Sequence, residues 1–300
     1  MAISLGIIGF GEVGGIFSRG LKEKANIDGV YVWDTLFAHD TAEGEKARKT
    51  ADSLGVHRAS AMTELCSNAT LMISAVTASN DLEVAKEAAR NARAGAILVD
   101  FNSASPGTKQ LAAAEIEGAG AHYVEAGVMT SVPPYGIRVP MLLGGPKADE
   151  VADIFNDWGM DAKVVSQQIG IASAIKMSRS IMIKGMEALV IEAYTNARAY
   201  GVENYVLPTL QETFPQIDWS LQGAYFFSRV VQHGRRRAEE MRESANTVRE
   251  GGFAPLMTDA TALKQDWLAG LARDGVFDGM AKNAPWQDYA DRLIKQVKKQ

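Results

Sequence analysis

Residues 3–14, ISLGIIGFGEVG, decide the fold, because a short apolar run leads directly into the pattern GxGxxG. In a strand–turn–helix unit that binds a dinucleotide, the first glycine allows the tight turn, the second lets the backbone approach a pyrophosphate, and the third lets the helix pack closely on the strand. We therefore predict that this turn binds a dinucleotide through Gly9, Phe10, Gly11, Glu12, Val13 and Gly14. Glycines in an ordinary strand-to-helix turn would give the same pattern, so the residues that follow must decide.

Asp34 is the first of these residues. It ends a second apolar run, VYVW at 30–33, and lies twenty residues after Gly14. An acidic side chain there can accept hydrogen bonds from both ribose hydroxyls of the adenosine half, and it would repel a 2′-phosphate. Residues 35–37, TLF, supply no arginine that would neutralise such a phosphate. The sequence thus favours NAD over NADP as the cofactor, although a solvated acid in a loop would also fit.

Seven β-rich runs alternate with helical periodicity in the first part of the chain, which is typical of a parallel sheet covered by helices. The runs are SLGIIGF, VYVWD, LMISAV, AILVD, HYVEAGV, PMLLGG and AKVV. From Gln167 onward these runs stop, and long helical patterns follow. We therefore predict an α/β chain in two domains: a doubly wound, mostly parallel Rossmann sheet at 1–165 that binds NAD(P), and an all-α domain at 166–300.

Composition argues against several classes of partner. The 300 residues include 31 basic and 36 acidic ones, so the net charge of −5 gives no overall electrostatic reason to bind nucleic acid or an anionic membrane. A lone cysteine, Cys66, cannot form an internal disulfide, and the first residues resemble neither a signal peptide nor a membrane anchor, so we expect a cytoplasmic protein. The His, Cys and Asp residues show no metal-ligand spacing, and we predict no metal. Small molecules or a second copy of the chain remain as partners.

Two more of the expected strands end in small and polar residues, SAVT at 74–77 and DFNS at 100–103. In an open α/β sheet, ligands bind beyond the carboxyl ends of the strands. We therefore predict cofactor contacts from Ala75, Val76, Thr77 and Asn102, with Val76 and Asn102 on the nicotinamide side. Ordinary polar turns are the alternative, and Ser105 followed by Pro106 marks the start of a helix.

Four segments, taken in order, resemble the β-hydroxyacid dehydrogenases. They are GFGEVG at 9–14, VDFNSASP near 100, EAGVMTSVPPYGIRVPMLLGG at 125–145 and GIASAIK at 170–176, and they resemble that family's cofactor, second cofactor, substrate and catalytic signatures. The family includes 3-hydroxyisobutyrate and tartronate semialdehyde enzymes and relatives of 6-phosphogluconate dehydrogenase. The later stretches HGRRRAEEMRESANTV and FAPLMTDAT resemble a poorly characterised branch of this superfamily with its own helical domain.

The resemblance implies that Lys176 is the catalytic residue. The family has asparagines three and four positions after this lysine, whereas Arg179 and Ser180 stand there in this chain. Desolvation or a cationic neighbour lowers the pKa of a lysine, which can then accept the hydroxyl proton of an alcohol as hydride leaves carbon. We expect Arg179 and Lys184 to lower this pKa and Glu187 to oppose them. A lysine that snorkels at a helix edge is the alternative.

The substrate signature implies a carboxylate-binding loop after residue 128, but a serine and two glycines are replaced here by bulkier side chains, so the pocket differs in shape. A Pro-rich turn is the alternative. In a second segment, His233, Arg236 and Arg237 lie on one face of an expected helix, where a guanidinium could bind a substrate carboxylate. A solvated basic face paired with neighbouring glutamates is the alternative. The predicted substrate residues are Met129, Thr130, Ser131, Arg179, Ser180, His233, Arg236 and Arg237.

Together these patterns predict an NAD-dependent oxidoreductase that moves hydride between nicotinamide and a small β-hydroxy acid or its carbonyl form. The resemblance implies that the all-α domain at 166–300 serves substrate binding and dimerisation, with a homodimer formed through the long helices after residue 167 and the apolar patch at 223–227, GAYFF. Two alternatives stay open. The same scaffold could reduce imines or larger carbonyl compounds, or the chain could be an NAD-binding sensor without turnover.

Overall fold

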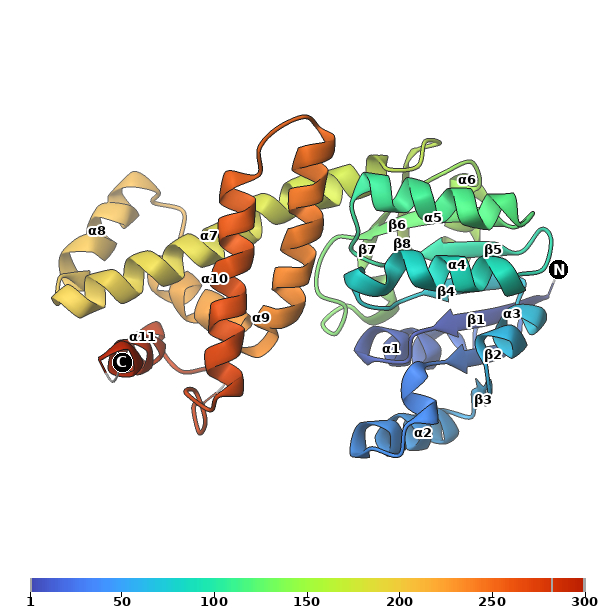
Figure 1. Ribbon diagram of the computed structural model, residues 1–300, viewed down its shortest axis with the longest axis horizontal. Helices are drawn as coiled ribbons and strands as arrows, with labels where there is room; N and C mark the ends of the chain where they lie inside the picture. The colour runs from blue at the N-terminus through green and yellow to red at the C-terminus, as the bar shows by residue number, and fades with distance from the viewer. Residues whose placement is uncertain (1, 282, 299–300) are drawn as a thin grey trace. The chain divides into compact units, whose positions relative to one another are not determined.

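The computed structural model describes residues 2–281 and 283–298 (Figure 1). The chain divides into two compact units, residues 1–177 and 178–300. The division falls inside one continuous helix, α7 (Ile171–Tyr200). The predicted catalytic lysine is therefore among the last residues of the first unit.

The first unit is built on an eight-stranded sheet with the order β3-β2-β1-β4-β5-β6-β7-β8. The strands are β1 (Ile3–Ile8), β2 (Ile27–Trp33), β3 (His57–Arg58), β4 (Leu71–Ser74), β5 (Ile97–Asp100), β6 (His122–Val128), β7 (Pro140–Gly144) and β8 (Asp161–Ser166). Strands β6 and β7 run antiparallel, and the other neighbours are parallel. The seven predicted runs are all strands, which confirms the mostly parallel sheet. Strand β3 was not predicted, because two exposed residues carry no periodic pattern.

Helices cover both faces of this sheet, and Figure 1 shows α4 and α5 lying across one of them. The helices are α1 (Glu12–Leu21), α2 (Ala42–Leu54), α3 (Met62–Asn68), α4 (Asp81–Asn91), α5 (Pro106–Gly118) and α6 (Ala148–Asp157), with short 3-10 turns η1 (Thr35–Ala38), η2 (Ala78–Asn80) and η3 (Gly136–Arg138). Successive side chains of a strand point to opposite faces. Accordingly, Ile7 packs in one core cluster with α1 and α6, and Ile8 packs in the other with α4 and α5. The doubly wound Rossmann fold is confirmed.

Local signals set the helix ends as expected. Ser105 is the N-cap of α5 and its hydroxyl accepts a hydrogen bond from the backbone N–H of Thr108 at 3.2 Å, while Pro106 occupies the first turn.

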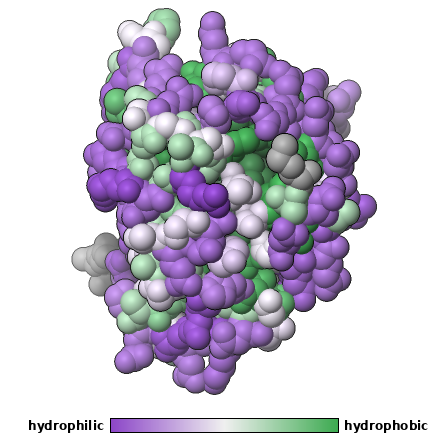
Figure 2. Space-filling view, turned by 90° about the vertical axis from the view of Figure 1, so that its right-hand side faces the viewer, coloured by the Kyte–Doolittle hydropathy of each residue, from purple (hydrophilic) through white to green (hydrophobic). Residues whose placement is uncertain are grey.

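On the face shown in Figure 2, hydrophilic residues predominate and apolar ones appear in small groups between them. Because helices bury both faces of the sheet, the polar outer sides of these helices are exposed to solvent.

The second unit is helical, which confirms the all-α region. Besides most of α7 it contains α8 (Glu203–Thr213), α9 (Trp219–Glu250), α10 (Leu256–Arg273) and α11 (Trp286–Val297). Its own core is rich in aromatic residues, and the ring centroids of Tyr194 and Trp286 lie 4.8 Å apart. In the part of the chain that the structure describes, no helix is both long enough and apolar enough to cross a membrane.

The predicted dimerisation patch at 223–227 needs correction. Phe226 and Phe227 are buried in the core of the second unit, and a Cβ on Gly223 would lie 2.6 Å from the ring of Tyr194. Tyr225 is half-exposed. This segment belongs to α9, and most of its apolar side chains point into the core of the second unit. It therefore does not form a continuous exposed apolar patch.

Candidate functional site

Four strands of the first unit, β2, β1, β4 and β5, end in register, and β6 pairs with the end of β5 before it continues to Val128. The residues paired across them form one row, which runs through Trp33, Ile8, Ser74, Asp100 and Glu125. Just beyond this row the chain leaves the sheet at one edge, where an open α/β sheet binds its ligands. The predicted cofactor residues that follow the row are Gly9, Asp34, Ala75, Val76 and Asn102. The structure therefore brings together segments that are far apart in the sequence.

The glycine-rich turn has the geometry that its sequence predicts. Gly9 has a φ of 90°, and a Cβ there would lie 2.5 Å from the carbonyl oxygen of Ala75. A Cβ on Gly14 would collide with the carbonyl oxygen of Gly9, whereas nothing lies within 4 Å of the Cβ position of Gly11. The N-cap Gly11 also has no side chain to satisfy the first N–H groups of α1, which suits them to an anion. The turn thus fits a pyrophosphate.

The other residues of this turn lie around it. Phe10 is buried with its ring centroid 5.6 Å from that of Phe37, Glu12 is the exposed first residue of α1, and Val13 packs against the core. The backbone of Phe10 is tied to the end of β2, because its N–H donates to Asp34 Oδ2 at 2.6 Å.

Asp34 connects the glycine-rich turn to the loop that follows β2. Its Oδ1 accepts a hydrogen bond from Leu36 N at 2.8 Å and caps η1. A carboxylate has further lone pairs, so Asp34 can still accept from ribose hydroxyls. Arg48, from α2, also reaches this loop and donates to the carbonyl oxygens of Phe37 and His39 at 3.0 and 2.9 Å. Sequence reasoning missed Arg48, since it considered only the positions next to Asp34.

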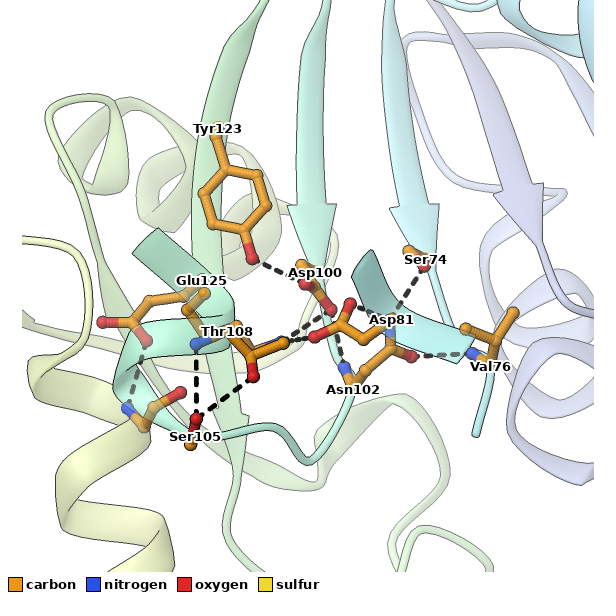
Figure 3. A network of polar contacts seen from close by, with 11 residues as sticks. Ser74, Val76, Asp81, Asp100, Asn102, Ser105, Thr108, Tyr123 and Glu125 are labelled. Atoms are coloured by element: carbon orange, nitrogen blue, oxygen red, sulfur yellow. Dashed lines mark hydrogen bonds and ion pairs between the residues drawn. The ribbon is translucent and has the colours of Figure 1, made fainter. Parts of the chain in front are cut away.

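Asn102 lies inside the fold, and its side chain holds the loop after β4 (Figure 3). Its Oδ1 accepts from Val76 N at 2.7 Å, and its Nδ2 donates to Ser74 Oγ at 3.0 Å and to Asp81 Oδ1 at 2.9 Å. Thr77 follows in the same loop and accepts from Asn80 Nδ2 at 2.8 Å. The predicted nicotinamide-side residues are therefore linked to each other through one amide.

A buried group of charges supports this amide. Lys109 Nζ lies 2.7 Å from Asp100 Oδ1 and 3.2 Å from Asp81 Oδ2, and each of these side chains is 1% exposed. Tyr123 donates to Asp100 Oδ2 at 2.5 Å. Burial and the charge of Asp100 raise the pKa of Asp81 to about 7. Burial acts to raise the pKa of Asp100 too, but the charge of Lys109 and the hydrogen bonds with Asp81, Lys109 and Tyr123 together outweigh burial and lower that pKa. Sequence reasoning missed this group, although a lysine on the buried face of α5 was a usable signal.

Glu125 fixes the start of α7. This carboxylate is fully buried and accepts three backbone hydrogen bonds, with Oε1 2.7 Å from Gly170 N and 3.0 Å from Ala172 N, and Oε2 3.1 Å from Ser173 N. Three of the N–H groups at the start of the helix are satisfied in this way. Gly144 on the neighbouring strand leaves the space, because a Cβ there would lie 2.5 Å from Glu125 Oε1.

Lys176 lies one turn farther along α7, partly buried, beside the carboxyl end of β6. A Cβ on Gly127 would lie 3.5 Å from Lys176 Cβ and 3.1 Å from the carbonyl oxygen of Ala172, so helix and strand meet closely there. The predicted substrate loop follows at once, with Met129 and Ser131 partly buried and Thr130 exposed. Lys176 and this loop therefore meet at the same edge of the sheet as the cofactor segments.

The predicted substrate residues of the second unit lie on α7 and α9. Arg237 forms a two-point ion pair with Glu187, with Nε 2.9 Å from Oε2, and both side chains are buried. Lys184 Nζ lies 2.7 Å from Glu240 Oε2 and donates to Ser180 Oγ at 3.2 Å. The charges of Lys184 and Glu187 are thus compensated within this unit, which removes the reason to expect that they tune Lys176. Arg179 and Arg236 are exposed and His233 is partly buried.

Residues 4–170 match the family model described as the NAD binding domain of 6-phosphogluconate dehydrogenase, which is more than half of the chain. The chain belongs to this family. Residues 197–268 of this family member match a domain of unknown function, DUF1932. The two matches confirm the resemblance to hydroxyacid dehydrogenases of a branch with its own helical domain, and they assign the first unit to nicotinamide-dinucleotide binding.

Three solved structures are similar to this member of the family. A conserved hypothetical protein from Sinorhizobium meliloti 1021 is 34% identical with a TM-score of 0.76, and the match covers 99% of this chain and 97% of that one. MTH1747, a conserved protein of unknown function with structural similarity to 3-hydroxyacid dehydrogenases, is 30% identical with a TM-score of 0.68, over 90% of this chain and 98% of its own. The 3-hydroxyisobutyrate dehydrogenase of Mycobacterium tuberculosis, solved with L-serine, is 16% identical with a TM-score of 0.70, over 98% and 99%. At that identity the last match shows the fold alone.

Family and fold indicate a dehydrogenase or reductase with a 3-hydroxyacid dehydrogenase-like architecture. Among residues 2–281 and 283–298, no three His, Cys, Asp or Glu side chains form a group that could hold a metal ion.

Proposed function

We propose that this protein is an NAD-dependent oxidoreductase that transfers hydride between nicotinamide and a small β-hydroxy acid or its carbonyl form. The observation that supports this most is the contact of Lys176 with Gly127, at the carboxyl end of β6. This position lies at the sheet edge that also carries the glycine-rich turn and Asp34. A proton-transfer group and a dinucleotide-binding turn at one edge are the two parts that such a reaction requires.

Lys176 acts as the general acid/base in this proposal. When the alcohol is oxidised, its O–H proton passes to the neutral amine of Lys176, the C–H bond breaks as a hydride, and the C=O bond forms. A bound nicotinamide supplies the hydride acceptor. In the reverse direction the ammonium of Lys176 returns the proton to the carbonyl oxygen. Positioned acid–base groups of this kind contribute about 10²- to 10⁴-fold to a rate.

The substrate carboxylate is assigned to the loop after β6, where Thr130 and Ser131 offer hydroxyl and backbone donors and Met129 supplies bulk. Arg179, Ser180, His233 and Arg236 complete the proposed substrate residues. Arg237 is left out of this role, because its guanidinium already pairs with the buried Glu187.

The preference for NAD over NADP is assigned to Asp34, which would repel a 2′-phosphate. Arg48 is the residue that tests this assignment, because its guanidinium reaches the same loop. We expect Asp34→Ala to weaken NAD binding more than NADP binding. If NADP binds more tightly than NAD to the unchanged protein and Arg48→Ala abolishes that difference, the preference is reversed.

A reductase of imines or larger carbonyl compounds is the second candidate. It is favoured by the bulkier loop at 129–131 and by Ser180, whose hydroxyl accepts from Lys184 where relatives hold an asparagine. Serine-like, phenylserine-like and hydroxyisobutyrate-like substrates, compared with cyclic imines, separate the two activities by their kcat/KM values.

The proposal is tested by that substrate panel together with Lys176→Met, and Lys163→Met on the exposed side of β8 is the matched control. We expect turnover of a hydroxy acid with NAD, a loss of about 10²-fold or more in Lys176→Met, and little change in the control. Turnover that survives Lys176→Met would rule out the assigned proton transfer. Binding of NADH without turnover of any panel member would identify a sensor instead.

A further inference from the structure

The amide of Asn102 is held in one orientation by its neighbours (Figure 3). An asparagine amide has an accepting oxygen and a donating nitrogen of similar shape, so its partners decide which end points where. Here the oxygen faces Val76 N at 2.7 Å and the nitrogen faces Asp81 Oδ1 at 2.9 Å. The hydroxyl of Ser74, which Nδ2 also contacts, can donate or accept and therefore decides nothing.

Asp81 decides the orientation, because an ionised carboxylate only accepts hydrogen bonds. Turning the amide around would place its oxygen against a carboxylate oxygen and its N–H group against the N–H of Val76. Both new contacts are repulsive, and the site is buried from water. The charge on Asp81 thus determines that the oxygen of the Asn102 amide, and not its nitrogen, faces the backbone N–H of Val76 in the loop after β4.

Asp81 is ionised at pH 8, above its pKa of about 7, and Lys109 favours this charged form. Its ammonium lies 3.2 Å from Asp81 Oδ2, the oxygen that does not contact Asn102, and 2.7 Å from Asp100 Oδ1. Two carboxylates at this depth would not both stay ionised without a cation between them. Asp100 in turn accepts from the backbone N–H of Asn102 at 2.8 Å, which fixes the start of this segment.

We propose that Asp81 and Lys109 are positioning residues of the cofactor site: they lock the Asn102 amide and thereby hold the backbone of Val76 at the sheet edge. The proposal rests on the proposed function in one respect, namely that Val76 lies on the nicotinamide side of a bound dinucleotide. Neither residue touches the cofactor, and both act through Asn102.

Asp81→Asn is the most informative substitution, since it keeps the shape and leaves Lys109 paired with Asp100. The new amide must turn its oxygen toward the ammonium of Lys109, so its NH₂ group faces Asn102. The Asn102 amide then has to turn its oxygen toward this NH₂ group, and its own NH₂ group meets the N–H of Val76. Glu83→Gln, on the exposed face of the same helix, is the matched control.

The first measurement is residue-resolved amide hydrogen exchange of the protein without ligand, at pH 8. We expect Val76 to exchange about fivefold faster or more in Asp81→Asn, the loss of roughly one hydrogen bond. The neighbouring Ala75 donates to Ile8 O at 2.8 Å and is the internal reference, which should not change. Equal rates at Val76 in both proteins, or a parallel increase at Ala75, would overturn the proposal.

The second measurement compares the Kd of NADH with the Kd of ADP-ribose, which lacks the nicotinamide. We expect Asp81→Asn to raise the Kd of NADH about fivefold and to change the Kd of ADP-ribose by less than about twofold. Equal weakening of both ligands, or of neither, would overturn the positioning role. If the unchanged protein binds neither ligand, the proposed function fails, whereas the exchange rates still decide whether Asp81 locks Val76. Lys109→Met serves as a second variant wherever it folds, with the same expected split between the two ligands.

Discussion

Glu125 Oε1 accepts a hydrogen bond from the backbone N–H of Gly170 at 2.7 Å, across 45 residues of sequence. Together with Ala172 and Ser173, which donate to the same carboxylate, this contact sets where α7 begins. The start of a helix sets the direction of every later side chain on it. The position of Lys176 beside Gly127 therefore depends on an acidic residue that itself does no proposed chemistry.

Glu125→Gln should destabilise the first unit and lower activity. One carboxylate oxygen is replaced by an NH₂ group, which cannot accept from the backbone N–H groups of α7, and a buried donor left unpaired costs about 1–3 kcal/mol. Thermal or chemical unfolding measures the loss. Glu117→Gln, exposed on α5, is the control and should change stability little. A variant as stable as the unchanged protein would show that the cap at α7 has no energetic role.

Gly144→Ala should be destabilising by about 1–3 kcal/mol, because its Cβ would lie 2.5 Å from Glu125 Oε1 and the carboxylate could move away only by giving up hydrogen bonds from the backbone of α7. Gly118→Ala, at the end of α5 with nothing within 4 Å of its Cβ position, should be neutral or slightly stabilising. Denaturant midpoints compare the two alanines directly. Equal midpoints would contradict the tight packing around Glu125.

Asp81→Asn should become more stable relative to the unchanged protein as the pH rises. Burial raises the pKa of Asp81 from 3.8 to about 7, so between these values the folded state holds a proton that the unfolded state has released. The folded protein therefore loses stability as the pH rises toward 7, and the asparagine variant lacks this titration. From pH 5 to pH 8 we expect the difference in unfolding free energy to move by about 2–3 kcal/mol in favour of the variant. A difference that is constant with pH would show that Asp81 keeps an ordinary pKa.

Arg237→Met should reduce stability more than it affects substrate affinity. Removing one partner of a buried ion pair leaves an uncompensated charge, which costs about 3–5 kcal/mol, whereas removing both partners is often nearly neutral. The double variant Arg237→Met, Glu187→Met should therefore recover much of the loss in an unfolding experiment. If instead the single variant is stable and only KM rises, Arg237 binds substrate as the sequence first indicated.

The sequence predicted the sheet well because local patterns carried the information. The glycine spacing at 9–14 and the alternating apolar runs report on neighbours in the chain, and all seven runs are strands. The start of α5 at Ser105 and Pro106 follows from the same kind of local signal. Strand β3 was not predicted, because its two residues are too few to show an alternating pattern and are identified as a strand only by their pairing with β2.

Contacts between distant segments could not be derived in the same way. Lys109 reads as one more lysine on a helix, and only the fold shows that it lies between Asp81 and Asp100. The pairing of Arg237 with Glu187 across 50 residues is of the same kind, as is the cap of α7 by Glu125. The burial of Phe226 and Phe227 likewise depends on which face of α9 meets its neighbours.

The most direct test of the proposed oxidoreductase is chemical rescue of Lys176→Ala. With the best hydroxy acid of the panel and NAD, we expect this variant to lose about 10²-fold or more in kcat while it binds NADH as tightly as the unchanged protein. Added methylamine should then restore part of the rate, increasingly at higher pH, because the free amine accepts the proton that Lys176 no longer takes. A variant that retains its kcat, or one that loses it and shows no response to methylamine at any pH, would contradict proton transfer by Lys176.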